Sequence, residues 1–449
     1  MTRTVSLPLW LFVLILLFAA VTFASHFLFP SVRWYLRRRA ERVVARLNAR
    51  LERPIQPFKL ARRTDMIQRL LYDPEVTQAI VDHARENNVR EDVAFEQARR
   101  YAREIVPSFS ATAYFGIAIR LARMLSTALY RVRLGYSDEA ALNGIDRDAT
   151  VVYVMNHRSN MDYVLVTYLA ARRSALSYAV GEWARVWPLS VLIRAMGAYF
   201  IRRKSRGALY RRVLARYVQM ATRGGVAQAM FPEGGLSLDG AIAPPKLGLL
   251  KYLTDGVDLA ARDVVFVPVA LNYDRVLEDR VLLEAGASGT RRFRARISVV
   301  ALHALRLLWR KIAGRFRRFG HAAVSFGMPL SLRARPELAE DTDALAAEVM
   351  ARIAAAVPVL PVPLVAQALL SHGARSRAEL ERDLAEMLTH VPPANVALPN
   401  DNRGLAVEEA LLGLCKRRLV AFDGTRYTPV EAEKETLDFY ARSIRHLIG

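Results

Sequence analysis

The sequence predicts an α/β fold with a mixed, partly parallel sheet flanked by helices. Between residues 150 and 332, short runs rich in valine alternate with stretches whose apolar residues recur at helical spacing. The clearest strand candidates are Thr150–Met155, Val226–Phe231 and Val264–Leu271, with helix candidates such as Met161–Arg173 and Leu209–Thr222 between them. Such alternation is typical of strands that are joined through helices and therefore run parallel in one sheet.

At 449 residues, the chain is too long for one ordinary hydrophobic core, so several domains are expected. Changes of pattern and proline clusters predict four parts: a transmembrane anchor (1–30), a basic helical region (31–145), a catalytic α/β domain (146–335) and a helical C-terminal domain (336–449). In the last part, helix candidates precede a hairpin signal at Asp423-Gly424. That order weakly resembles a winged-helix arrangement.

The first part is an almost unbroken apolar run from Leu7 to Ala24. It is about long enough to span a bilayer if Phe27–Phe29 extend it. Arg3 alone precedes the run, whereas a cluster of arginines follows it from Arg33 onward. This asymmetry favours a single uncleaved anchor in the inner (cytoplasmic) membrane, with the catalytic domain in the cytoplasm. A cleaved signal peptide and a buried core helix are the alternatives.

The chain is strongly basic, with 65 Lys and Arg residues against 43 Asp and Glu residues. The net charge of +22 calls for an anionic partner, either nucleic acid or an anionic membrane surface. No base-reading motif or aromatic-basic platform for single strands is recognisable, so no nucleic-acid partner is expected. The single cysteine, Cys415, excludes an internal disulfide framework and a cysteine-based zinc site.

The turn after the first strand candidate carries His157 and Asp162, with four residues between them. If Ser159 or Asn160 caps the following helix, Asp162 lies in its first turn and its carboxylate can bend back to His157. That contact would fix the histidine tautomer and leave the other ring nitrogen as a general base for a hydroxyl. Taken alone, so short a His–Asp spacing is more often structural.

Two basic or glycine-rich stretches follow in the chain. A short apolar run from Gly197 ends at Arg202 and Arg203, whose guanidinium groups suit phosphate oxygens. Further on, Phe231-Pro232-Glu233-Gly234-Gly235-Leu236-Ser237 places an acid and paired glycines at a strand end. Paired glycines let a backbone approach a ligand closely, and a serine hydroxyl can donate to a phosphate.

The last stretch is the strand candidate that ends near Asn272 and Tyr273. Because sites in such sheets lie at the carboxyl ends of strands, His157, Glu233 and Asn272 are expected to converge.

In this order, the four blocks resemble the glycerolipid acyltransferase superfamily, and within it the glycerol-3-phosphate acyltransferases of the bacterial membrane-bound type. The double glycine after Glu233 favours this branch over lysophosphatidic acid acyltransferases. Leu236 is a departure, because the family usually has an arginine there. Arg202, Arg203 and Lys246 are therefore the expected phosphate ligands.

The resemblance implies transfer of a fatty acyl group from acyl-CoA or acyl-ACP (acyl carrier protein) to the sn-1 hydroxyl of glycerol 3-phosphate, giving lysophosphatidic acid for phospholipid synthesis. It implies an acyltransferase-type fold at a phospholipid membrane, with no metal and no cofactor beyond the acyl thioester. His157 would be the base and Asp162 would orient it. The residues expected to hold the substrate are Arg202, Arg203, Glu233, Gly234, Gly235, Ser237 and Lys246.

Two other functions remain open. Leu236 leaves room for an acyltransferase that acts on 1-acylglycerol 3-phosphate or another lysophospholipid. The non-enzymatic alternative is a basic scaffold that binds membrane or nucleic acid.

Overall fold

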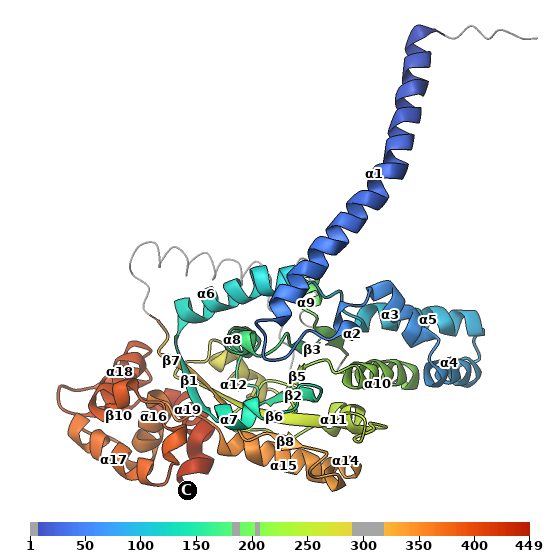
Figure 1. The fold of residues 1–449 in the computed structure, drawn as a ribbon. Helices are drawn as coiled ribbons and strands as arrows, with labels where there is room; N and C mark the ends of the chain where they lie inside the picture. The colour runs from blue at the N-terminus through green and yellow to red at the C-terminus, as the bar shows by residue number, and fades with distance from the viewer. Residues whose placement is uncertain (1–7, 182–188, 203–206, 290–317) are drawn as a thin grey trace, which may run out of the picture. The chain divides into compact units, whose positions relative to one another are not determined.

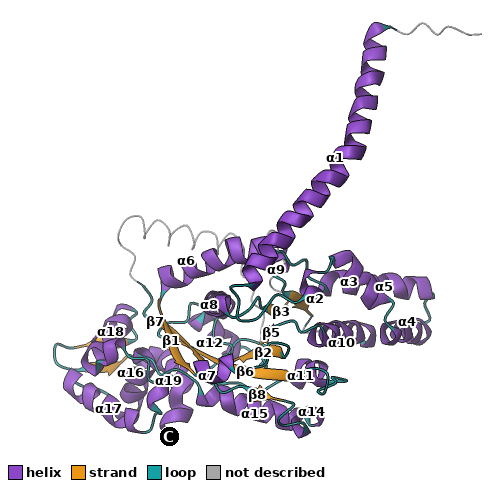
Figure 2. Cartoon of the chain, in the orientation of Figure 1, coloured by secondary structure: helices purple, strands orange, loops and turns teal. Residues whose placement is uncertain are grey.

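The computed structural model describes residues 8–181, 189–202, 207–289 and 318–449 (Figures 1 and 2). The chain divides into two compact units, Met1–Ile55 and Gln56–Gly449. The four domain boundaries expected from the sequence stay a prediction.

The first unit contains one long helix, α1 (Leu9–Asn48), which covers the expected anchor and the arginine-rich segment after it. Its early turns carry exposed apolar side chains, among them Trp10 and Phe18. Within the described part of the chain, however, no helix meets the length and apolarity needed to cross a bilayer. The predicted transmembrane helix is therefore not confirmed.

The second unit begins with helices, as expected, and then joins the sheet earlier than expected. The helices are α2 (Pro57–Leu60), α3 (Arg63–Leu71), α4 (Pro74–Glu86), α5 (Glu91–Ile105) and α6 (Ile119–Leu129), the last continuing a π-helical segment, Thr112–Ala118. Strand β1 (Arg131–Ser137) follows, then α7 (Glu139–Asn143). The region expected to be helical up to residue 145 thus also contains β1, where half-buried Val132 and exposed Leu134 lie alongside a later strand.

Over the residues that the structure describes, the central sheet has eight strands in the order β1-β7-β6-β2-β5-β3-β4, with β8 paired to β6. Their bounds are β2 (Thr150–Met155), β3 (Ser177–Gly181), β4 (Tyr199–Ile201), β5 (Gln228–Met230), β6 (Val264–Tyr273), β7 (His321–Phe326) and β8 (Leu330–Ser331). Strand β2 runs parallel to β5 and β6, whereas β7 and β8 run antiparallel to β6. The predicted mixed, partly parallel sheet is confirmed.

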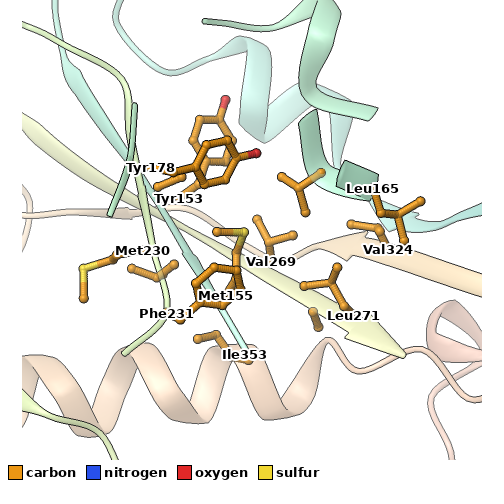
Figure 3. Close-up of a cluster of buried hydrophobic side chains, with 14 of the residues drawn as sticks. Tyr153, Met155, Leu165, Tyr178, Met230, Phe231, Val269, Leu271, Val324 and Ile353 are labelled. Atoms are coloured by element: carbon orange, nitrogen blue, oxygen red, sulfur yellow. The ribbon is translucent and has the colours of Figure 1, made fainter. Parts of the chain in front are cut away.

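Helices cover both faces of this sheet, which explains why β2, β6 and β7 are buried along their whole length. Figure 3 shows Leu165 of α8 (Met161–Leu169) and Ile353 of α15 (Thr342–Ala355) reaching the strands from opposite faces. The remaining helices of this part are α9 (Leu189–Ala195), α10 (Ala208–Arg223), α11 (Leu247–Thr254), α12 (Asp279–Ala287) and α14 (Glu337–Glu340).

The strand directions bring several loops to one edge of the sheet. The carboxyl ends of β2, β3, β5 and β6 lie at this edge because these strands are linked by parallel pairing. Strand β7 is antiparallel to β6 and parallel to β1, so the amino ends of β7 and β1 lie at the same edge. Loops at this edge are where an α/β sheet places its sites.

The C-terminal helices lie beside the β1 and β7 side of the sheet (Figure 1). They are α16 (Pro361–His372), α17 (Arg377–Thr389), α18 (Arg403–Lys416) and α19 (Lys434–Ile448). The predicted hairpin forms between β9 (Val420–Phe422) and β10 (Tyr427–Pro429), and its turn places Gly424 at φ 104°. The expected order of helices followed by a hairpin is therefore present, and α19, which follows the hairpin, packs against α16.

Candidate active site

The turn between β2 and α8 holds His157 and Asp162 in direct contact. The Nδ1 atom of His157 lies 2.9 Å from Oδ2 of Asp162, and both side chains are buried. A carboxylate beside Nδ1 favours the tautomer that carries its proton there. The other ring nitrogen, Nε2, is then the atom that can accept a proton.

Asp162 is held by three further donors. Its Oδ2 accepts the backbone N–H groups of Arg158 (2.8 Å) and Ser159 (3.0 Å), and its Oδ1 accepts the hydroxyl of Tyr273 (2.7 Å). Asn160 occupies the N-cap position of α8 but makes no side-chain cap, so Asp162 itself closes the turn. Such a network fixes the carboxylate and, through it, the imidazole.

Aromatic rings complete the cage around the imidazole. The ring of Phe231, which follows β5, stacks on His157 at 3.9 Å between centroids, and Tyr163 of α8 meets it edge-on at 5.6 Å. Three neighbours thus restrict the orientation of the ring: one carboxylate and two aromatic side chains.

Glu278, which follows β6, binds the same turn from another side. Its carboxylate accepts the Ser159 hydroxyl (2.8 Å) and the Asn160 side-chain amide (3.1 Å). Burial raises the pKa of Glu278 above its ordinary value. Neither Glu278 nor Tyr273 was singled out from the sequence as a site residue, because both lie more than 100 residues from the motif they support.

His157 borders a cavity of about 310 Å³ at the carboxyl ends of the strands. Four of the predicted site residues line it: His157, Arg202, Gly234 and Lys246. Arg211 of α10, which the sequence did not single out, adds another cation to the lining. The cavity therefore brings a base and several cations to one place, with apolar and aromatic walls that include Phe231.

The cations differ in what they already bind. The guanidinium of Arg202 makes two hydrogen bonds to the buried Glu104 of α5, at 2.8 and 2.6 Å, and this pairing raises its pKa. Lys246 lies directly before α11, with its side chain against Gly234, whose φ is 66°. A Cβ at Gly234 would come within 2.7 Å of Lys246 Cδ, so this approach requires glycine. Arg203 lies outside the described residues.

Glu233 and Ser237 hold the loop that supports His157. The Oε1 atom of Glu233 accepts the His157 backbone N–H (2.8 Å), and its Oε2 accepts that of Ala243 (2.9 Å). The Ser237 backbone N–H donates to the His157 carbonyl (2.9 Å), and its hydroxyl donates to Ala241 (2.7 Å). Both were predicted as substrate ligands, but neither they nor Gly235 belong to the cavity lining.

Burial raises the pKa of Glu233 to about 7, although two backbone N–H groups and the Arg158 charge favour the ionised carboxylate. A carboxyl group with that pKa changes its charge near neutral pH.

Asn272 does not converge with His157 and Glu233, contrary to the prediction. Its side-chain amide donates to the Pro358 carbonyl (3.0 Å) and lies 3.2 Å from the Ser443 hydroxyl. Successive side chains of a strand point to opposite faces, so it is the next residue, Tyr273, that reaches Asp162.

Two family models match the chain. Residues 140–272 match the model described as Acyltransferase, and residues 308–447 match the model of the glycerol-3-phosphate acyltransferase C-terminal region. The first match contains His157, Asp162, Arg202, Glu233 and Lys246, and the second contains the C-terminal helices.

Many curated relatives carry the name glycerol-3-phosphate acyltransferase. The protein of Pseudomonas putida is 30% identical over 354 residues, which cover 73% of this chain and 41% of the relative. That of Alteromonas mediterranea is 28% identical over 427 residues, covering 87% and 50%. The chain thus spans about half, or less, of the length of the curated relatives it matches. The predicted resemblance is confirmed in sequence.

Among solved structures, the 1-acyl-sn-glycerophosphate acyltransferase of Thermotoga maritima matches with a TM-score of 0.32 and 18% identity, over 53% of this chain and 78% of that one.

Proposed function

Because the chain is related in sequence to the glycerol-3-phosphate acyltransferases, we propose that it transfers a fatty acyl group from an acyl thioester to the sn-1 hydroxyl of glycerol 3-phosphate. The product would be lysophosphatidic acid, a precursor in phospholipid synthesis. The observation that carries the proposal is the His157–Asp162 pair at the wall of a cavity that also contains Arg202, Arg211 and Lys246.

In this proposal His157 is a general base and then a general acid. Its Nε2 takes the proton of the glycerol hydroxyl, and the oxygen attacks the thioester carbonyl carbon. When the tetrahedral intermediate collapses, the C–O ester bond remains, the C–S bond breaks, and the thiolate receives the proton from His157. Asp162 orients the imidazole and stabilises its charged form, with Tyr273 and two backbone N–H groups holding the carboxylate.

Lys246 and Arg211 are the cations we assign to the phosphate of the acceptor. Both line the cavity with His157, whereas the guanidinium of Arg202 already makes two hydrogen bonds to Glu104. The Glu104 carboxylate offsets the charge of Arg202, so the net attraction for a dianion comes mainly from Lys246 and Arg211. Gly234 lets Lys246 lie close to the loop, which narrows the site around the acceptor.

We assign the N-terminal helix α1 to membrane attachment at the cytoplasmic face of the inner membrane. Its exposed apolar side chains precede an arginine-rich stretch, and the whole chain carries a net charge of +22. This charge would also attract the acidic acyl carrier protein, so acyl-ACP and acyl-CoA are both candidate donors. Flotation of membranes in a density gradient tests the attachment: attached protein floats with the membranes, and protein that stays in the soluble fractions would contradict it.

The catalytic proposal is tested by an acceptor and donor panel on the purified full chain. Glycerol 3-phosphate, lysophosphatidate and glycerol are offered as acceptors, each with acyl-CoA and with acyl-ACP. We expect product from glycerol 3-phosphate and little from glycerol, which lacks the phosphate. Turnover of lysophosphatidate alone would favour the second candidate, for which Leu236 in place of arginine leaves room. No acyl transfer with any pair would contradict both.

A further inference from the structure

A second cavity, of about 940 Å³, lies along the same edge of the sheet as the active-site cavity but shares no lining residue with it. We call it the junction cavity. The loop after β6, the start of β1, the residues before β7 and the end of α18 surround it. It thus lies between the acyltransferase sheet and the C-terminal helices, and its size is that of a small-molecule site.

The lining of the junction cavity is rich in cations. Among the described residues, six arginines and lysines contribute to it: Arg131, Arg275, Arg280, Arg318, Lys416 and Arg417. Its acids are already bound. Glu409 pairs with Arg131, and Asp279 pairs with Arg417. Asp274 accepts the Nδ1 and backbone N–H groups of His321 and the backbone N–H of Val362. The cavity therefore keeps a positive excess.

Three of these cations have no salt-bridge partner in the parts of the chain that the structure describes: Arg275, Arg318 and Lys416. The guanidinium of Arg275 lies 4.5 Å from the centroid of the Phe319 ring. Burial and the neighbouring Arg417 charge lower the pKa of Arg275. An anion that pairs with a half-buried guanidinium stabilises its charged form and offsets the repulsion from neighbouring positive charges.

From this geometry we infer that the junction cavity is a binding site for a small phosphate-bearing molecule, distinct from the acceptor site. Phosphate suits the lining because its several oxygens can bind a planar guanidinium and an ammonium group at once. Exposed Leu277, Val281 and Leu412 stand among the cations and would contact an apolar part of the ligand. The phosphate therefore belongs either to a soluble compound or to a lipid headgroup.

The loop that lines the cavity also holds the catalytic turn. Tyr273 precedes it and binds Asp162, while Glu278, within it, binds Ser159 and Asn160. Between these two contacts, Arg275 and Leu277 face the junction cavity. A ligand that binds Arg275 thus contacts a short segment that is joined to the His157 turn on both sides.

The test is isothermal titration of the full chain with pyrophosphate and, separately, with dioctanoyl phosphatidate. Wild type is compared with Arg275→Gln/Lys416→Gln, which removes two cations of the cavity. The matched control is Arg90→Gln/Lys434→Gln, which removes two exposed cations that form ion pairs elsewhere. Thermal unfolding of each variant checks the fold, and Lys416→Gln alone, at an exposed position, is the variant least able to disturb it.

We expect at least one probe to bind wild type and control alike, with the cavity variant at least tenfold weaker. Hydrogen exchange should show protection of residues 274–281 and 409–417, which separates this site from phosphate bound near Lys246. Tighter binding of phosphatidate identifies a lipid headgroup, and tighter binding of pyrophosphate a soluble compound. Equal weakening in the control, or unchanged binding in the cavity variant, would overturn the inference. Binding is measured without turnover, so the result is independent of the proposed enzymatic activity.

Discussion

The described part of the chain contains two buried His–Asp pairs with nearly the same geometry and different surroundings. His157 and His321 each place Nδ1 2.9 Å from a carboxylate oxygen, of Asp162 and Asp274 respectively. Their exposed fractions are 2% and 1%. The contact distance and the burial therefore do not separate a catalytic pair from a structural one.

What separates them is the second ring nitrogen and the neighbours of the carboxylate. His157 lines the cavity that also contains Lys246 and Arg202. The Nε2 of His321 instead lies 3.6 Å from Oε2 of the half-buried Glu409. Asp162 binds a catalytic turn, whereas Asp274 accepts backbone N–H groups of β7 and α16. The first pair has access to a substrate, and the second joins the sheet to the C-terminal helices.

The largest effect is expected from Asp162→Asn. The amide oxygen can still accept the three N–H groups that meet Oδ2, whereas the amide NH2 would face the Tyr273 hydroxyl. The variant therefore lacks the negative charge that stabilises the protonated imidazole. We expect kcat for acyl transfer to fall by about 10²–10⁴-fold with KM for the acceptor little changed. Steady-state kinetics with acceptor and donor varied in turn measures this. A fall of less than threefold would show that the His157–Asp162 pair is structural, like the His321–Asp274 pair.

The next largest effect is expected on the free energy of unfolding, which should depend on pH through Glu233. This residue accepts the backbone N–H of His157 in the first pair. Its folded pKa of about 7 lies above the roughly 4.3 of an unfolded chain. The folded state therefore keeps a proton that the unfolded chain has released, and the stabilisation is present at acid pH and lost as the pH rises through about 7.

Urea unfolding at pH 5 and pH 8 measures this effect against Glu233→Gln, which cannot titrate. We expect wild type to lose about 2–3 kcal/mol more than the variant between the two pH values. Parallel pH profiles of the two proteins would show that Glu233 titrates as it does in the unfolded chain.

His321→Ala should lower the stability of the protein and leave kcat nearly unchanged, the opposite of what is expected for Asp162→Asn. It removes a donor to buried Asp274, and we expect a loss of about 2 kcal/mol in the free energy of unfolding. The kcat of the folded enzyme should stay within a factor of about three, because Tyr273 still binds Asp162. Denaturant unfolding and kinetics on the same preparation give both numbers. A large fall in kcat at unchanged stability would show that the second pair participates in the chemistry.

The smallest effect is expected from Tyr273→Phe, which removes one of the four donors around Asp162. One hydrogen bond contributes on the order of 1 kcal/mol, so we expect kcat to fall about fivefold. The control Tyr72→Phe removes an exposed hydroxyl outside the site and should change kcat by less than twofold. Equal losses in the two variants would remove the special role of Tyr273.

The parts of the fold that the sequence predicted correctly are those marked by a continuous apolar run or by a turn signal. The apolar runs became β2, β5 and β6, and the Asp423-Gly424 turn became a hairpin. The sequence did not predict β1, because apolar and polar residues alternate only weakly there. It predicted Asn272 as a site residue, whereas the neighbouring Tyr273 faces the site. A strand reverses side-chain direction at every residue, so an error of one position changes which side chain reaches the site.

For the site, local motifs were enough to find His157, Asp162, Gly234 and Lys246 near one another, but not the roles of their neighbours. Glu233 and Ser237 hold the backbone of the loop, and Arg202 is bound to Glu104 from a distant helix. The supporting contacts of Glu104 and Glu278 join residues that are about 100 positions apart. No spacing in a single sequence reports such pairs, because they depend on how the sheet and helices pack.

The most direct test of the central claim is acyl transfer to glycerol 3-phosphate by His157→Ala, measured beside wild type at equal concentration of folded protein. If His157 is the general base, the rate falls at least about 10²-fold while thermal unfolding stays within a few degrees of wild type. An unchanged rate in the folded variant would contradict the assignment of the reaction to this pair.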